Sequence, residues 1–306
     1  MLRIMVKKFL IDLLLSPDSE KSPLYDQSDN KLRDTTSDRV YEIIDDTPIL
    51  FAAGERINIS PLHERSATSF DYREHYNKDA EAFDYFKEDD TPAARTERRR
   101  SRETIISKIE GSALQILDIG CGGGWIAQHF TARKNYVVSL DISLQNPVRA
   151  LQKYPSEFHA AVVADAFNLP FKNESFDAIV ASEVIEHLTD PKIFIKRWLR
   201  VLKPGGKLIV LTPYNEKIIY HTCVHCNKIT PANAHLHSFN EKNISGYLPR
   251  EGIQTITTRF NNKYLTKLRI YTLFGFLPFR LWFFLDSVAN KIIKKPALLI
   301  VEIIKN

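Results

Sequence analysis

The chain has 306 residues, a formal net charge of +5 and 44% hydrophobic residues, which is enough for a full α/β core with additions. This charge is too small to indicate nucleic-acid binding by itself. Three cysteines, Cys121, Cys223 and Cys226, are too few for a secreted disulfide framework, so a cytoplasmic location is expected. Residues 1–15 do not read as a signal peptide, because Asp12 interrupts their apolar run, and no apolar stretch reaches the length of a membrane span.

Residues 1–55 are expected to form a small β-rich unit, separate from the rest of the chain. Three leucines at 13–15 precede a polar, turn-rich segment, and residues 39–44 have the β-branched and aromatic content of a strand. The alternative is a disordered extension, because the polar middle of this stretch is rich in charge.

Residues 56–110 are predicted to be a helical lead-in to the core. Aromatic side chains recur within 70–76 and 82–86, at a spacing that fits ordinary helix packing. Five arginines surround the start of a predicted helix at 103–109: Arg95, Arg98, Arg99, Arg100 and Arg102. A solvated helix face explains them most simply, and contact with a phosphate-bearing acceptor is the alternative.

Strands and helices alternate between residues 111 and 213, which predicts a parallel sheet with helices on both faces. Ligands of such sheets bind beyond the carboxyl ends of the strands. Polar residues at those ends are therefore expected to surround one crevice. The strands are expected at 114–119, 136–140, 159–163, 176–183 and 207–211.

The first of these strands ends in a glycine-rich turn. Gly120 and Gly122 lack Cβ atoms, so the turn can be tight and a ligand can approach the backbone closely. Asp141 ends the second strand about 20 residues later, where a carboxylate can accept both ribose hydroxyls of a nucleoside. The third glycine falls at Gly124, one residue early for a dinucleotide fingerprint. A dinucleotide enzyme is therefore the disfavoured alternative.

Four landmarks, in this order and spacing, resemble the class I S-adenosylmethionine-dependent methyltransferases: the glycine turn, Asp141, the Asp165-Ala166 pair and the Leu-Lys-Pro-Gly-Gly turn at 202–206. The resemblance implies a methyltransferase domain over residues 111–306, with S-adenosylmethionine as cofactor. It also implies that the aromatic segments within 56–110 fold over the cofactor as a lid, as the alternative to ordinary helix packing. It also implies a Rossmann-like α/β fold with a seven-stranded, mostly parallel sheet whose last strand is antiparallel. It says little about the methyl acceptor.

The resemblance and the side-chain chemistry together assign the cofactor site. The glycine turn would pass under the methionine part, Asp141 would take the ribose hydroxyls, and Asp165 with the Ala166 N–H would meet the adenine amine. Asp118 is expected to orient the turn or the amino group of the cofactor. The predicted cofactor-binding residues are Asp118, Gly120, Gly122, Asp141, Ile142, Asp165, Ala166 and Glu183.

The N-terminal unit resembles the small zinc-ribbon domains that partner or precede methyltransferases. In those domains a Leu-Leu-x-Cys-Pro-x-Cys start and a later Cys-x-x-Cys hold one zinc ion. Here Ser16, Ser19, Asp34 and Ser37 occupy the ligand positions. A serine hydroxyl is a poor zinc ligand, so no metal is expected, and the unit must be held by its own strands or by packing on the main domain.

Glu183, Glu186 and His187 would lie on one face of a helix beginning at residue 183. The Glu-x-x-Glu-His pattern is similar to the metal site of small-RNA 3′-end 2′-O-methyltransferases and to an arrangement in some quinone-pathway O-methyltransferases. A divalent ion there would bind vicinal hydroxyls of the acceptor and acidify one of them. The alternative is a structural Glu-His pair without a metal. His187 and Glu186 are the predicted catalytic residues, with a histidine of 221–237 as another candidate base.

An insertion at 214–240 carries a second candidate metal site. Cys223, Cys226, His235 and His237 offer four ligands within fifteen residues, which predicts a structural tetrahedral zinc ion. The alternatives are two reduced cysteines with pocket histidines, or a share of His235 or His237 in the Glu183, Glu186 and His187 cluster. The same histidines cannot complete both sites.

The C-terminal part is predicted to hold a sixth strand at 253–260 and a seventh, antiparallel strand at 297–304. Between them lies an apolar segment, 265–295, whose most apolar piece is 273–285. It is expected to be a helix that covers the acceptor pocket or packs on the sheet. The alternative is a peripheral membrane contact that brings an apolar acceptor to the site, with nearby lysines meeting anionic head groups.

We therefore expect a methyltransferase that acts on an oxygen or nitrogen of a small or lipid-linked molecule. In-line methyl transfer needs positioning more than covalent catalysis. An RNA 2′-O-methyltransferase is the first alternative, although nucleic acid is the less expected partner. A non-catalytic interaction protein is the second alternative, and the intact cofactor landmarks disfavour it. The sequence does not indicate an oligomeric state.

Overall fold

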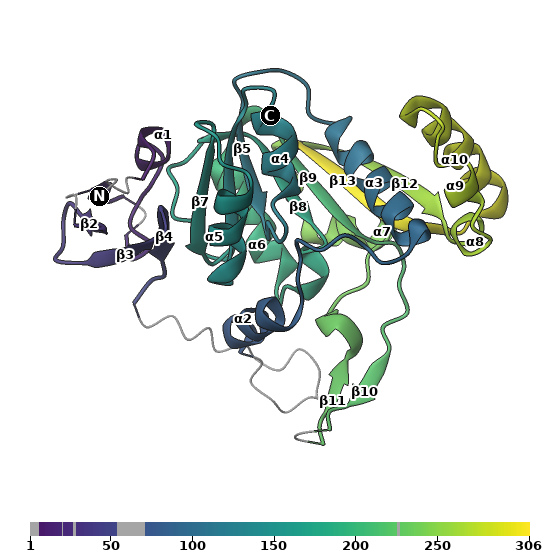
Figure 1. Cartoon of the computed structure of the whole chain (residues 1–306), viewed down its shortest axis with the longest axis horizontal. Coiled ribbons are helices and arrows are strands. Elements are labelled where there is room, and N and C mark those ends of the chain that lie inside the picture. The colour runs from purple at the N-terminus through teal and green to yellow at the C-terminus, as the bar shows by residue number, and fades with distance from the viewer. Residues whose placement is uncertain (1–5, 20, 27–28, 54–70, 225–226) are drawn as a thin grey trace.

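The computed structural model describes the chain except residues 1–5, 20, 27–28, 54–70 and 225–226. An eleven-stranded sheet runs through the described residues in the order β1-β2-β3-β4-β7-β6-β5-β8-β9-β13-β12, with helices on both faces (Figure 1). Its strands are β1 Leu24–Asp26, β2 Lys31–Asp34, β3 Val40–Ile44, β4 Thr47–Leu50, β5 Gln115–Ile119, β6 Tyr136–Asp141, β7 His159–Ala164, β8 Phe176–Ser182, β9 Leu202–Pro213, β12 Ile253–Asn262 and β13 Pro296–Lys305.

The remaining elements cover the sheet or extend from its ends. A short hairpin, β10–β11, projects from the rest of the molecule (Figure 1). These elements are α1 Lys8–Ile11, α2 Tyr72–Ala82, α3 Pro92–Ile106, α4 Trp125–Thr131, α5 Gln145–Lys153, η1 Ile185–His187, α6 Pro191–Val201, β10 Tyr220–Thr222, β11 Ile229–Pro231, η2 Ala232–Ala234, α7 Glu241–Ile244, η3 Ser245–Tyr247, α8 Lys263–Lys267, α9 Ile270–Leu273 and α10 Phe279–Ile293.

The central strands β7, β6, β5, β8 and β9 pair in parallel, and β13 pairs antiparallel with both β9 and β12. The predicted mostly parallel α/β sheet with an antiparallel last strand is therefore confirmed. Every residue of β7 is buried, as expected for a parallel strand covered on both faces. The expected turn at 202–206 lies within β9 as an irregularity, because the pairing with β8 shifts between Phe176–Leu202 and Ala178–Lys207.

The sheet has more strands than the seven expected, because the N-terminal strands continue it. Strand β4 pairs in parallel with β7, with Ile49 opposite Val163 and Leu50 opposite Ala164. This pairing covers a main-chain edge of β7 that would otherwise be open. Leu24 and Leu32 also belong to the same buried cluster as the central strands. The expected unit boundary near residue 55 lies outside the described residues.

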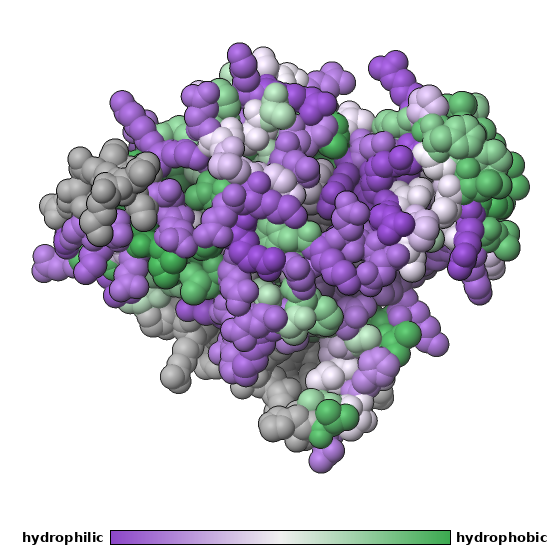
Figure 2. Space-filling view, viewed as in Figure 1, coloured by the Kyte–Doolittle hydropathy of each residue, from purple (hydrophilic) through white to green (hydrophobic). Residues whose placement is uncertain are grey.

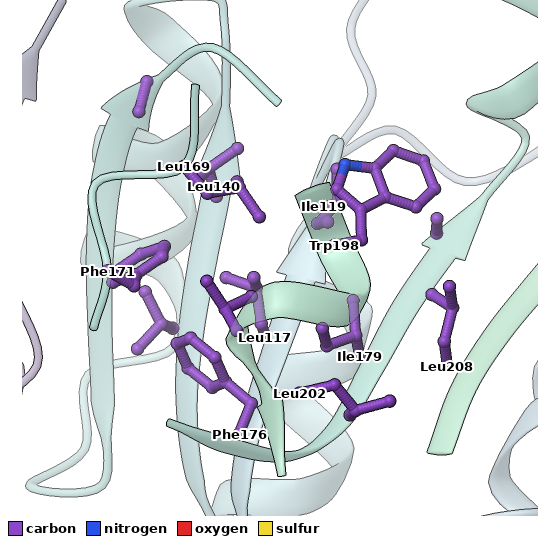
Figure 3. Packing of buried hydrophobic residues seen from close by; sticks show 14 of the residues in the cluster. Leu117, Ile119, Leu140, Leu169, Phe171, Phe176, Ile179, Trp198, Leu202 and Leu208 are labelled. Atoms are coloured by element: carbon purple, nitrogen blue, oxygen red, sulfur yellow. The ribbon is translucent and has the colours of Figure 1, made fainter. Parts of the chain in front are cut away.

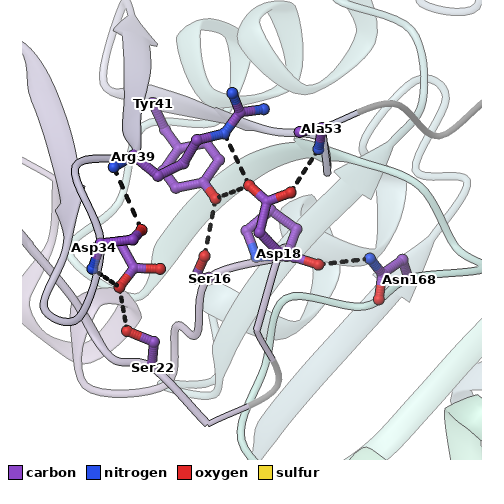
Figure 4. Close-up of polar contacts among 10 residues, drawn as sticks. Ser16, Asp18, Ser22, Asp34, Arg39, Tyr41, Ala53 and Asn168 are labelled. Carbon is purple, nitrogen blue, oxygen red and sulfur yellow. Dashed lines mark hydrogen bonds and ion pairs between the residues drawn. The ribbon is translucent and has the colours of Figure 1, made fainter.

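Ser16 and Asp34, two of the four residues predicted to stand at zinc-ligand positions, take part in side-chain hydrogen bonds (Figure 4). Ser16 Oγ lies 2.8 Å from the Tyr41 hydroxyl, and Ser22 donates to Asp34. Asp34 also accepts from the backbone N–H of Thr36 and of Ser37, at 2.7 and 3.2 Å. Ser16, Ser22 and Asp34 are all buried, so this hydrogen-bond network lies inside the N-terminal part of the sheet.

Two buried clusters lie on opposite faces of the sheet, because successive side chains of a strand point in opposite directions. Leu117 and Ile119 of β5 face one cluster and Ile116 faces the other. Figure 3 shows the first cluster, in which Trp198 of α6 and Phe176 of β8 pack near these leucine and isoleucine side chains. The two cores fix the ends of the central strands, and therefore the site.

The arginine run is only partly the solvated face that the sequence predicted. Arg100 is 1% exposed. It donates to the carbonyl oxygens of Gly275 and Leu277, at 3.1 and 2.8 Å, and pairs with Glu103 at 2.8 Å. The expectation was wrong for this residue because the 275–277 loop, distant in sequence, folds back over α3.

Candidate active site

The glycine turn between β5 and α4 has the tight geometry that its sequence predicted. Gly120 and Gly122 have φ angles of 70° and 45°, in the left-handed region. The N–H groups of Gly120 and Cys121 both donate to the Leu140 carbonyl of β6, at 2.8 and 3.0 Å. The turn is therefore fastened to the strand that carries Asp141.

Asp141 is held in place at the carboxyl end of β6. Its carboxylate accepts from the backbone N–H of Gly122 at 3.2 Å and of Ser143 at 3.0 Å, and from the Asn146 side-chain amide at 3.2 Å. Burial raises the pKa of this carboxyl, and the three donors oppose that shift. Ile142, the next residue, is half-buried. Asp141 thus lies beside the glycine turn, as a ribose-binding carboxylate would.

Asp118 of β5 is 3% exposed, and its Oδ2 atom has no hydrogen-bond partner among the described residues. Burial and the charge of Asp141 raise the pKa of Asp118 to about 8. An unsatisfied buried carboxylate oxygen is costly. The amino group of a bound S-adenosylmethionine carries the charge and the donors that would satisfy it, so this residue fits the predicted cofactor.

Asp165 lies at the end of β7 and accepts from the Phe167 N–H at 2.8 Å and from the Tyr72 hydroxyl. The backbone carbonyl of the adjacent Ala166 accepts from Trp198 Nε1 at 3.0 Å. A Cβ atom at Gly123 would lie 2.4 Å from the Tyr85 carbonyl oxygen. Helix α2 and the segment after it therefore lie against both the glycine turn and the Asp165 end of the predicted cofactor site.

The helix expected to begin at Glu183 does not form. Glu183 has a φ of 57°, and only the single 3₁₀ turn η1 follows it. Glu186 and His187 are adjacent in this turn, while the Glu183 side chain is exposed. The expectation was wrong because the chain makes a sharp left-handed turn directly after β8, which the Glu-x-x-Glu-His pattern does not reveal.

A cluster of possible metal ligands nevertheless forms from Glu186, His187 and His235. One ligand atom of each lies within 4.8 Å of the others. Glu186 is 1% exposed; its Oε2 accepts from Thr212 Oγ1 at 3.1 Å, while Oε1 has no partner among the described residues. Burial above all raises the pKa of Glu186 to about 8. Burial and the neighbouring His235 lower the pKa of His187 to about 4, so this imidazole is neutral at pH 7.

The two imidazoles are oriented by their Nδ1 atoms. His187 Nδ1 lies 3.3 Å from the Ala234 carbonyl oxygen, and His235 Nδ1 lies 2.5 Å from Glu216 Oε2. With Nδ1 as donor to an oxygen, each ring presents the Nε2 lone pair on its other side, which is the arrangement found for metal-ligating histidines. The ring centroids of His187 and His235 are 4.8 Å apart.

Backbone contacts hold the insertion against this cluster. The Leu236 and His237 N–H groups donate to the Glu186 carbonyl, at 2.8 and 3.1 Å. His237 itself packs against Phe239 and Tyr247. The insertion at 214–240 thus places His235 next to Glu186 and His187, directly after β8.

The predicted zinc site receives no support from the described residues. Cys223, His235 and His237 do not come together as a ligand group in the part of the chain that the structure describes, and Cys226 lies outside that part. The β10–β11 hairpin carries Cys223 toward its tip (Figure 1), while His235 follows η2 back to the sheet.

Two residues of the site were missed by sequence reasoning. Thr212 bonds Glu186, and Glu216 bonds His235. Thr212 could have been found as a polar residue at the end of an apolar strand. Glu216 carries no comparable signal, because it lies in an irregular segment.

The family model described as a methyltransferase domain matches residues 117–210. This range contains the glycine turn, Asp141, Asp165 and Glu186 in the geometry described above. Residues 117–210 form a class I methyltransferase domain.

Curated relatives of this methyltransferase domain are O-methyltransferases by name. The ubiquinone biosynthesis O-methyltransferase of Bradyrhizobium sp. (strain ORS 278) is 37% identical over 103 residues, which are 33% of this chain and 40% of that protein. The malonyl-[acyl-carrier protein] O-methyltransferase of Erwinia billingiae (strain Eb661) is 32% identical over 98 residues, 32% of this chain and 38% of the relative. The chain thus spans about 40% of the length of these relatives.

Among solved structures, the S-adenosylmethionine-dependent methyltransferase of Mesorhizobium loti shares the fold of the methyltransferase domain. Its TM-score is 0.50 at 18% identity, over 67% of this chain and 98% of that protein. At this identity the likeness concerns the fold alone.

Proposed function

We propose that this protein transfers a methyl group from S-adenosylmethionine to a hydroxyl oxygen of a small or lipid-linked acceptor. The observation that carries the proposal is the buried, unpartnered Oε1 atom of Glu186, close to His187 and His235 and beside the glycine turn. The names of the curated relatives support an oxygen as the acceptor atom.

The cofactor residues have separate tasks in this proposal. The glycine turn admits the methionine part, Asp118 binds its amino group, and Asp141 binds the ribose. The Asp165 carboxylate accepts a hydrogen bond from the adenine amine, either in place of the bond from the Tyr72 hydroxyl or in addition to it. Helix α2 and residues 83–86 act as a lid that excludes water and fixes the sulfonium for in-line attack.

The acceptor hydroxyl must lose its proton, and two arrangements of the same cluster could assist this. In the favoured one, Glu186, His187 and His235 hold a divalent cation, since two imidazoles and one carboxylate form a common ligand set for divalent transition metals. Such an ion, when bound, would lower the pKa of a coordinated hydroxyl. In the other, neutral His187 accepts the proton through Nε2 as a general base.

Cofactor binding is tested first, by calorimetry with S-adenosylhomocysteine. The wild type should bind, and Asp141→Ala should lose about 2 kcal/mol or more, because charge-assisted hydrogen bonds to the ribose are removed. Asp29→Ala, at an exposed carboxylate paired with Arg33, is the matched control and should bind like the wild type. A wild type that does not bind would overturn the proposal in favour of a non-catalytic protein.

The acceptor is tested with methyl-labelled S-adenosylmethionine and an extract of the source cells. Label in the organic phase would support a lipid-linked acceptor, and label in a low-molecular-weight aqueous fraction would support a small one. Nuclease-sensitive label in the precipitate would instead identify RNA as the acceptor and contradict the proposal.

The cation is tested with purified protein and catechol, the simplest aromatic vicinal diol. Activity should fall on chelation, return with manganese ions, and be absent in Glu186→Gln, because an amide is a weaker ligand than a carboxylate. Glu241→Gln alters a carboxylate outside the cluster, bonded to Tyr214 and Arg259, and should keep the activity. Activity that survives chelation but not His187→Ala would favour the general-base arrangement.

A further inference from the structure

Helix α10 has the reverse of the usual surface-helix pattern. Its buried residues include Asp286 and Asn290 beside Trp282. Asp286 accepts from the backbone N–H groups of Asn261 and Asn262, at 2.9 and 3.0 Å, and from the Tyr271 hydroxyl. Asn290 Oδ1 accepts from the Asn262 side chain at 2.9 Å. Polar contacts therefore attach the inner side of the helix to the end of β12.

The outer side of α10 is apolar. Leu281, Phe284, Leu285, Val288 and Ile292 are exposed, and Phe284 and Ile292 reach 62% and 75%. Their spacing places them in one stripe along the helix, opposite the buried residues. A surface helix normally directs such a stripe into the core. Here the stripe is exposed, and no other element of the described residues covers it.

Neighbouring side chains widen the stripe into a larger surface, which Figure 2 shows as the hydrophobic area over α8 to α10. We call it the apolar face. Its members are Leu268, Leu273, Phe274, Phe276, Leu281, Phe284, Leu285, Val288 and Ile292. Phe276 is 78% exposed. Contiguous apolar surfaces of this kind mark contact sites for membranes, proteins or ligands.

The charged residues of the segment 263–295, which carries the apolar face, are almost all basic. The only acidic residue between 263 and 295 is the buried Asp286, whereas the same stretch holds seven basic residues: Lys263, Lys267, Arg269, Arg280, Lys291, Lys294 and Lys295. Arg280 and Lys291 are about three helical turns apart and lie along the same edge of the stripe. In the described part of the chain, no carboxylate forms an ion pair with any of the four basic residues at or after the start of α10: Arg280, Lys291, Lys294 and Lys295.

We propose that the apolar face binds the surface of a membrane that contains anionic phospholipids. The apolar stripe would enter the boundary between head groups and acyl chains, while the flanking cations would meet the phosphates. The contact is peripheral, because no helix among the described residues is long and apolar enough to cross a bilayer. The basic edge favours an anionic surface over a second copy of this chain, which carries the same basic residues and offers no complementary acidic edge in the segment 263–295.

Hydrogen bonds from α3 fix the loop at one end of the apolar face. Arg99 and Arg100 of α3 donate to the Gly275 carbonyl, and Arg100 also donates to that of Leu277. These bonds anchor the loop that presents Phe274 and Phe276. A rigid apolar face loses less conformational entropy on binding than a flexible one would. The proposal does not depend on the methyl-transfer function.

The test is flotation of the full chain with vesicles of phosphatidylcholine alone, or of three parts phosphatidylcholine and one part phosphatidylglycerol. We expect binding to the anionic vesicles, weakened by salt, and little binding to phosphatidylcholine. Phe276→Ser/Phe284→Ser and, separately, Lys291→Glu/Lys294→Glu should each reduce the bound fraction about tenfold. Retained S-adenosylhomocysteine binding and an unchanged circular dichroism spectrum would show that the variants are folded.

Matched controls change the same chemistry elsewhere. Ile219→Ser/Ile229→Ser removes apolar side chains of similar exposure at the β10–β11 hairpin, and Lys192→Glu/Lys196→Glu makes the same change of charge on α6. Both should bind vesicles like the wild type. Absence of binding, equal binding to both vesicles, or equal loss in the controls would overturn the proposal. A lipid-free dimer by light scattering that Phe276→Ser/Phe284→Ser converts to a monomer would assign the face to a second copy instead.

Discussion

Gly120 and Val184 lie so close together that a Cβ atom at position 120 would be 2.7 Å from Val184 Cγ2. Gly120 belongs to the turn predicted to pass under the cofactor, and Val184 lies two residues before Glu186. This contact joins the cofactor side of the crevice to the proposed acceptor side. In the proposed reaction, this close packing would bring the methyl donor near the acceptor hydroxyl.

Gly120→Ala should therefore weaken both the fold and cofactor binding. The positive φ and the clash with Val184 together should cost about 2–4 kcal/mol of unfolding free energy, read from urea denaturation. S-adenosylhomocysteine affinity should fall as well. Adding Val184→Ala should restore part of the stability, because the clash is relieved while the backbone strain remains. No rescue by Val184→Ala would show that the contact is not the source of the loss.

The buried Glu186 should make stability fall as pH rises. Its ordinary pKa is 4.5 and its folded pKa is about 8, so the folded state binds the extra proton between these values. The free energy of unfolding from this group is highest below pH 4.5 and declines as pH rises toward 8. In Glu186→Gln, the decline of the free energy of unfolding between pH 4.5 and pH 8 should be smaller by about 1 kcal/mol or more. This difference corresponds to roughly 3 °C in Tm.

Asp118 titrates in the same range, so the slope should be reduced in Glu186→Gln rather than abolished. Glu241→Gln is the control and should keep the wild-type slope. Manganese ions should raise Tm more at pH 8 than at pH 6, because a cation replaces the proton on the carboxylate. A wild-type Tm that rises steadily from pH 5 to pH 8 would contradict the raised pKa of Glu186 in the folded protein.

Arg100→Met should destabilise the protein by about 2–4 kcal/mol, because two carbonyl oxygens and Glu103 lose a buried charged partner. The loss is measured as a shift of the urea midpoint. Arg95→Met changes an exposed member of the same arginine run that bonds only local carbonyls, and should cost no more than about 0.5 kcal/mol. Equal effects of the two substitutions would argue against the special role of the 275–277 contact.

The N-terminal hydrogen-bond network should make the protein sensitive to acid. Burial alone would raise the pKa of Asp34, but hydrogen bonds from Ser22, Ser16 and Thr36 hold it well below its ordinary value of 3.8. The stabilisation is complete above that value and is lost as pH falls below it. Asp34→Ala should therefore cost about 1–3 kcal/mol at pH 7 and less at pH 3.

Asp38→Ala, at an exposed position nearby, should change stability by at most about 0.5 kcal/mol at either pH. Thermal unfolding at the two pH values gives the comparison. A cost of Asp34→Ala that is the same at pH 3 and pH 7 would mean that the carboxylate charge is not what the network requires.

The sequence by itself determined the central sheet and the cofactor landmarks. Apolar runs ending in Asp141 and Asp165 and a glycine turn between strand and helix are local patterns, and the parallel topology follows from their alternation. The antiparallel pairing of β13 with β12 was expected from the resemblance to the methyltransferase family rather than from a local pattern.

Tertiary structure alone decided which residues meet across long separations in the chain. His235 joins Glu186 and His187 because the insertion returns to the end of β8 through bonds to a backbone carbonyl, and no spacing rule encodes such a return. In the same way β4 extends the sheet beside β7, Arg100 is buried by a loop 175 residues away, and α10 directs its apolar stripe outward. Each outcome depends on which surface the remainder of the fold leaves open, and a local pattern of residues carries no information about that.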